Sequence, residues 1–198
     1  MIFDALRMIQ TGLGHYIQES EGLSEGPQEL VVVDNIAMSD ALGGVRSNMN
    51  DRIVMSLINL QEETTLKNAP NYRMENGRTI YQNPPVSLNL FVLFSALHPG
   101  QYPTALQRLA RVIEFFQWKK EFSFTLPPSS GGGNAGGIAK DVRVLVDLYT
   151  LTFDQINHLW GTLGGKQVPF AMYRMRLVAI SADKQQGEGA AITERVYE

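Results

Sequence analysis

The stretch that most constrains the fold runs from residue 86 to residue 96, VSLNLFVLFSA. Its side chains alternate with a period of two, which places the following apolar residues on one face of an extended chain: Val86, Leu88, Leu90, Val92 and Phe94. This pattern predicts the longest β-strand of the chain. A second run, residues 52–60, has apolar side chains at both odd and even positions, which is typical of a central strand covered on both faces. A sheet with buried central strands is therefore expected.

Further strands are predicted at residues 30–33, 142–148 and 168–180, with a short extended piece around Phe122 and Phe124. Three segments have helical periodicity: residues 2–18, a segment after Pro103, and residues 153–163, with Thr152 as the expected N-cap. In the second helix one apolar stripe is formed by Leu106, Leu109, Ile113 and Phe116, with Val112, Phe115 and Trp118 beside it. The order of elements predicts an α+β fold, a mostly antiparallel sheet with about three helices packed on it.

One domain is expected over residues 1–181, because the 198 residues fit a single core with additional arms. Residues 61–85 are polar and contain Asn76-Gly77, the strongest short-range hairpin signal, so they predict a projecting hairpin or loop arm. Residues 127–137, PPSSGGGNAGG, predict a flexible loop. Residues 182–198 form a polar tail that is expected to order only against a partner.

Composition excludes several classes of function. The chain has no cysteine, which excludes disulfides and cysteine-based metal sites, and its net charge of −3 argues against general nucleic-acid binding. No apolar run is long enough to span a bilayer. The first residues are not expected to be a signal peptide, because Asp4 comes before any basic residue and no continuous apolar stretch follows. Neither nucleic acid nor membrane is expected as a partner.

A search for catalytic residues finds little. His15, His98 and His158 are far apart in the sequence and lack partners at metal-ligand spacing, and the cluster at residues 131–137 is not followed by the Lys-Ser/Thr of a phosphate loop. Glu62 and Glu63 are adjacent on a strand and point to opposite faces. We expect no catalytic residue, metal or cofactor; a small enzyme using the glycine-rich loop and Asp141 remains an alternative.

Arginine and tyrosine residues in the arm suggest a protein interface, because both residue types are enriched at such surfaces. The candidate interface residues of the arm and the tail are Lys67, Tyr72, Arg73, Arg78, Tyr81, Arg195 and Tyr197. As a nucleic-acid patch the set is too sparse. An ordinary surface loop is the other interpretation of the arm.

Four stretches together resemble one family: residues 53–68, 83–96, 111–117 and 151–180. In content, order and spacing they are similar to tail terminators, or caps, of extracellular contractile injection systems of the antifeeding-prophage type, over residues 1–181. The resemblance implies a phage tail-terminator-like fold and no catalytic residue. It also implies a homohexameric ring at the baseplate-distal end, in contact with the inner-tube protein and the sheath protein, ending the growth of both.

The resemblance also implies that the protein assembles in the bacterial cytoplasm and is then released as part of an extracellular particle. An alternative of another class stays open: a non-enzymatic adaptor or connector elsewhere in the same particle, at the baseplate or in cargo loading. Position in the particle separates the two roles, because a cap lies opposite the baseplate.

Overall fold

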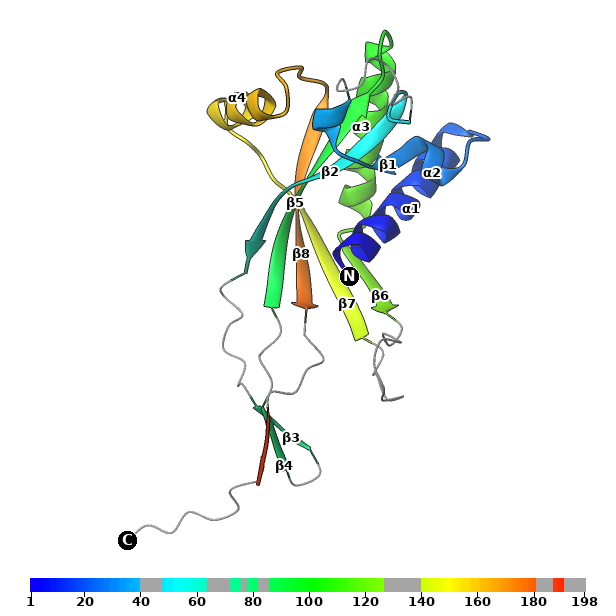
Figure 1. Cartoon of the computed structure of the whole chain (residues 1–198). Coiled ribbons are helices and arrows are strands. Elements are labelled where there is room, and N and C mark those ends of the chain that lie inside the picture. Colours follow the sequence, from blue (N-terminus) through cyan, green and yellow to red (C-terminus); the bar gives the residue numbers. More distant parts are fainter. Residues whose placement is uncertain are drawn as a thin grey trace.

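The predicted long strand lies near the middle of a six-stranded main sheet with the order β1-β2-β5-β8-β7-β6 (Figure 1). The computed structural model describes residues 1–39, 48–63, 72–75, 78–81, 86–126, 140–180 and 187–190. The strands of this sheet are β1 (Val31–Val33), β2 (Arg52–Glu62), β5 (Val86–Leu97), β8 (Phe170–Ile180), β7 (Lys140–Leu148) and β6 (Glu121–Leu126). All neighbours are antiparallel except β1 and β2, so the sheet is mixed.

Helices α1 (Ile2–Glu21) and α3 (Tyr102–Trp118) cover one face of the main sheet, together with the short α2 (Pro27–Leu30). The core on this face combines the apolar stripe of α1 with the even-numbered side chains of β5, as the alternation predicted. Helix α1 ends at Gly22, whose left-handed φ of 62° suits glycine.

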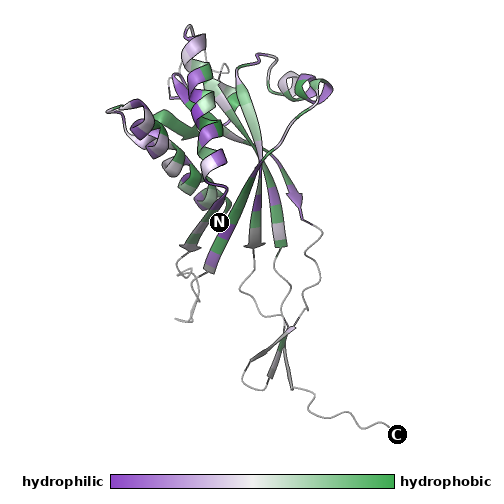
Figure 2. Ribbon diagram, turned by 180° about the vertical axis from the view of Figure 1, so that it is seen from behind, coloured by the Kyte–Doolittle hydropathy of each residue, from purple (hydrophilic) through white to green (hydrophobic). Residues whose placement is uncertain are grey.

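Helix α4 (Phe153–Thr162) packs against the opposite face of the sheet, where a smaller core includes Val54, Leu93, Trp160 and Met172. Figures 1 and 2 show α4 on the far side of the strands from α1 and α3. The expected N-cap is confirmed: the Thr152 hydroxyl accepts a hydrogen bond of 3.3 Å from the Gln155 backbone N–H. The α+β fold with helices packed on the sheet is therefore confirmed, although the helices occupy both faces.

A second, smaller sheet contains β3 (Tyr72–Glu75), β4 (Arg78–Tyr81) and β9 (Gly187–Ala190), in the order β3-β4-β9. In the chain, β3 follows β2, β4 precedes β5 and β9 follows β8. The small sheet therefore repeats the strand order β2-β5-β8 of the main sheet. Figure 1 shows this sheet beyond their ends. Glu75 pairs with Arg78, which leaves only positions 76 and 77 between β3 and β4. The projecting hairpin arm predicted from the sequence is thus confirmed.

Strand β9 was not anticipated, because it lies within the segment interpreted as a polar tail. Its sequence, Gly-Glu-Gly-Ala, lacks the β-branched and aromatic residues that mark strands. Pairing with β4 makes it a strand, with Tyr81 opposite Gly187 and Arg78 opposite Ala190. The predicted glycine-rich loop at 127–137 lies outside the described residues, as does the rest of the tail.

Candidate protein interfaces

The arm brings together four of the seven residues predicted to form an interface. Tyr72 and Tyr81 are register partners on β3 and β4, so their side chains share one face. Their rings are 53% and 49% exposed. Arg73 pairs with Ile80, and Arg78 with Glu75. The role of these residues in binding stays a prediction.

Three other predicted interface residues, Lys67, Arg195 and Tyr197, lie outside the described part of the chain.

The arm is too short to build a sizeable core. Each of its three strands has four residues, and small sheets need a hydrophobic face or a packed neighbour for stability. Among the arm residues whose side chains the structure describes, only Thr79 and Ile80 are buried. An arm of this kind is well suited to gain packing from a partner.

An open hollow of about 750 Å³ lies between α1, the C-terminal end of α3 and the start of β6. We call it the aromatic groove and define it by Tyr16, Phe115, Trp118 and Phe122. The rings of Tyr16 and Trp118 stack with centroids 6.3 Å apart, and the Trp118 side chain is 72% exposed. A hollow of this size, lined by aromatic side chains, is typical of a binding surface.

The sequence did not predict this groove, and its prediction for α3 was right only in part. Phe116 of the predicted stripe is buried and Leu109 packs against the core, but Leu106 and Ile113 are exposed. Val112 and Phe115, predicted beside the stripe, are buried. Buried Arg108 occupies a position on the inner face and obscures the apolar pattern. The exposed Trp118 at the end of a helix was the available signal, since tryptophan is enriched at interface centres.

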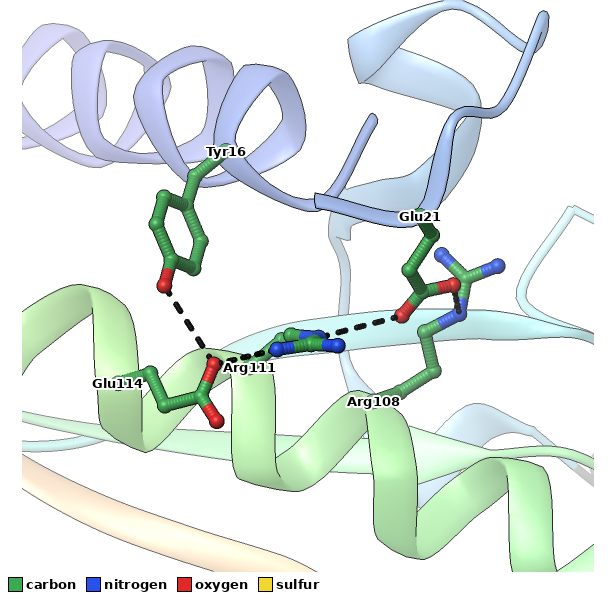
Figure 3. Close-up of polar contacts among 5 residues, drawn as sticks. All are labelled: Tyr16, Glu21, Arg108, Arg111 and Glu114. Carbon is green, nitrogen blue, oxygen red and sulfur yellow. Dashed lines mark hydrogen bonds and ion pairs between the residues drawn. The ribbon is translucent and has the colours of Figure 1, made fainter. Parts of the chain in front are cut away.

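A polar network fixes α1 against α3 beside the groove (Figure 3). Nε of Arg108 lies 3.3 Å from a carboxylate oxygen of Glu21, and Nε of Arg111 lies 3.9 Å from the other. Arg111 also donates a hydrogen bond of 2.7 Å to Glu114, and the Tyr16 hydroxyl donates one of 3.4 Å to the same carboxylate oxygen. The network links one wall of the groove to the other.

His98 is buried at the end of β5, near Arg108. Burial lowers the pKa of its imidazole, and the positive charge of Arg108 lowers it further. The other two histidines are elsewhere: His15 lines the aromatic groove and His158 lines a second hollow. Among the described residues, no group of three or more His, Cys, Asp or Glu residues could hold a metal ion.

The second hollow, of about 390 Å³, lies between α4 and the main sheet. Phe91 and Tyr149 meet edge to face in its lining, with centroids 5.1 Å apart. The sheet face away from α1 and α3 also carries ion pairs. Arg143–Glu121 at 2.9 Å and Arg174–Asp147 at 3.7 Å join neighbouring strands. Arg176 of β8 lies 3.7 Å from Glu63, which follows β2, with β5 between the two strands.

The first residue of α4, Phe153, is 87% exposed, more than any other large apolar side chain described. Asp154 follows it and is exposed as well. None of the helices in the described part of the chain is long and apolar enough to cross a membrane.

Comparison with known proteins gives a match to one family model and matches to solved structures. The model of the Pvc16 N-terminal domain family matches residues 5–194. No curated protein matches significantly. Among solved structures, a sheath/tube terminator of an extracellular contractile injection system, called PVC, matches with a TM-score of 0.57 and 15% identity. The tube-terminating cap of the anti-feeding prophage matches with a TM-score of 0.57 and 13% identity.

The solved terminators are longer than this chain. The alignments cover 100% of this chain, but 62% of the PVC terminator and 61% of the anti-feeding prophage cap. At these identities the structural matches show a shared fold. Together with the family match, they confirm the resemblance to terminators of contractile injection systems that the sequence predicted.

Proposed function

The chain belongs to the Pvc16 N-terminal domain family, and from this we propose that it is a tail terminator of a contractile injection particle. It caps the baseplate-distal end, where it binds the last ring of the inner tube and the last disc of the sheath and ends the growth of both. One observation carries the proposal: the whole chain matches the fold of a solved sheath/tube terminator. The role requires binding alone, so we propose no catalytic step and no cofactor.

A terminator acts by occupying the end of a polymer without offering the surface that the next subunit needs. We propose six copies in a closed ring, which requires two different, complementary side surfaces on each subunit. Specific interfaces bury about 800 Å² per partner, so a small subunit commits much of its exterior to contacts. Six modest contacts to the tube then act together, and their avidity makes the docking effectively permanent.

Within the ring, we assign the arm to contact with the tube or with a neighbouring subunit. The arm projects beyond the main sheet (Figure 1). The register of β3 and β4 places Tyr72 and Tyr81 on one face of the arm, and both are exposed. Large exposed aromatic side chains of this kind are typical interface anchors. The sheet face away from α1 and α3, with its ion pairs, suits a hydrated contact. The chain assembles in the bacterial cytoplasm and leaves it as part of the particle.

The proposal is tested by finding where the protein sits. Particles carrying an epitope-tagged copy of the full chain are labelled with a gold-conjugated antibody and imaged by electron microscopy. We expect label at the end opposite the baseplate. Label at the baseplate would contradict the terminator role and favour the adaptor role.

A double variant tests the arm. Tyr72→Ser with Tyr81→Ser should leave the melting temperature of the main domain nearly unchanged and reduce incorporation into particles. Tyr102→Ser, which removes an exposed aromatic ring at the start of α3, is the matched control and should be incorporated normally. Equal incorporation of the double variant and the control would exclude the arm from the contact.

A further inference from the structure

The exposed Phe153 and the aromatic groove are complementary features on opposite sides of one subunit. Single exposed apolar residues are common on protein surfaces, so Phe153 alone carries no argument. The groove, however, offers an aromatic lining with room for the side chains of a helical turn. Burying a phenylalanine side chain strengthens an association by roughly ten- to a hundredfold relative to leaving it exposed.

Phe153 cannot enter the groove of its own chain. Helix α4 packs on Val54, Leu93 and Met172 from one face of the sheet. The groove is built by α1, α3 and β6, and its ring Phe115 belongs to the core on the other face. Figures 1 and 2 show the sheet between these helices from two sides. A Phe153 side chain that reaches the groove must therefore come from another copy.

Charge supports the same match. Lys119 lines the groove and is exposed, and its ammonium nitrogen lies 5.1 Å from the centroid of the Phe122 ring. Asp154 is exposed beside Phe153 at the start of α4. Two carboxylates, Glu19 and Glu121, line the groove as well, but Glu121 is paired with Arg143 at 2.9 Å. Lys119 is therefore the lysine of the lining that can meet a carboxylate beside an incoming aromatic ring.

We propose that the first turn of α4 of one copy docks into the aromatic groove of the next copy, with Phe153 against Trp118 and Asp154 facing Lys119. This contact is head-to-tail, because it joins two different surfaces, and it forms a ring when the rotation between copies closes. The inference deepens the proposed terminator function and rests on it, since it names the side surfaces of the ring.

The test uses the absence of cysteine from the chain, which makes single engineered thiols unambiguous. Asn157→Cys and Ser123→Cys variants of the full chain are prepared separately, and both keep Phe153. Asn157 is exposed one turn after Phe153 in α4, and Ser123 is an exposed residue of the groove lining. Each is treated with a short bis-maleimide alone and as an equal mixture, both as purified protein and in particles. Tyr102→Cys mixed with Asn157→Cys is the matched control, because Tyr102 lies at the opposite end of α3.

We expect covalent dimers in the mixture of Asn157→Cys with Ser123→Cys, and a ladder of larger species from the double variant that carries both substitutions in one chain. Dimers from Asn157→Cys alone would indicate a two-fold contact between identical surfaces and would overturn the inference. Equal crosslinking with Tyr102→Cys would overturn it, as would a crosslink from Asn157→Cys to a tube or sheath protein instead of a second copy.

A second measurement does not depend on crosslinking geometry. Phe153→Ala should weaken self-association at least tenfold, while Tyr102→Ala leaves it unchanged and both variants keep the wild-type melting temperature. The contact would be refuted if particles are capped but show no crosslink and incorporate Phe153→Ala fully. That result would leave the terminator function unaffected. If the protein is absent from particles, the terminator function fails, and crosslinking of the purified chain alone decides the contact.

Discussion

The buried arginine of α3 gives the sharpest test of how the helical layer is held together. Arg108 is 8% exposed, and its charge faces Glu21 at the end of α1 across 3.3 Å. We predict that Glu21→Gln destabilises the fold much more than Glu114→Gln. The second substitution removes the carboxylate that Arg111 contacts at the protein surface.

The magnitudes follow from exposure. Removing one partner of a fully buried ion pair costs about 3–5 kcal/mol, because the remaining charge stays buried without compensation. The Glu21 side chain is 22% exposed, so some water reaches the pair, and we expect a loss of about 2 kcal/mol. The Glu114 side chain is 48% exposed, and a pair of this kind contributes about 0.2–1 kcal/mol.

Equilibrium unfolding in urea, followed by tryptophan fluorescence, measures both losses. With a slope of about 2 kcal/mol per M, the midpoint of Glu21→Gln should fall by about 1 M. The double variant Glu21→Gln with Arg108→Met should recover most of the loss, because it removes both charges. Equal losses for the two single variants, or no recovery in the double variant, would refute the account of a buried pair.

Two further predictions concern glycine and histidine positions. A methyl group at Gly14 would overlap the backbone of Pro27, whereas one at Gly161 meets no heavy atom within 4 Å. In thermal or urea unfolding, Gly14→Ala should therefore lower the free energy of unfolding by about 2 kcal/mol, and Gly161→Ala should raise it by up to about 1 kcal/mol. Equal effects of the two substitutions would contradict the close approach of α1 and α2. Burial and Arg108 lower the pKa of His98 below its usual 6.5, so the unfolded chain binds the proton more readily. The contribution of His98 to the free energy of unfolding should be fully present above about pH 6.5 and should be lost as the pH falls below that value. His98→Gln should flatten this pH dependence. An unchanged pH profile would exclude His98 as its source.

Most regular elements could be predicted from the sequence because their patterns are local. The period of two in β5 and the three- and four-residue spacing in α1 identify both elements and their buried faces. The Asn76-Gly77 pair located the hairpin of the arm, and Thr152 located the start of α4. In each case the signal lies within the residues that form the element.

The features that sequence reasoning missed depend on contacts between distant segments. Strand β1 pairs parallel to β2, and β9 is a strand only because β4 lies beside it. Arg108 lies on the buried side of α3, where its Nε is 3.3 Å from a carboxylate oxygen of Glu21 in α1, a contact that a hydrophobicity pattern cannot show. For the same reason the aromatic groove, whose walls come from α1, α3 and β6, could not be predicted.

The central claim, termination of the tube and sheath, is tested most directly by measuring particle lengths in a strain that lacks this gene. Electron micrographs of particles from the deletion strain are compared with the intact strain and with the deletion strain carrying the gene on a plasmid. The terminator role predicts tubes or sheaths of variable length, overgrown or unsheathed, with uniform length restored by the plasmid. Uniform particles with a normal capped end in the deletion strain would contradict it.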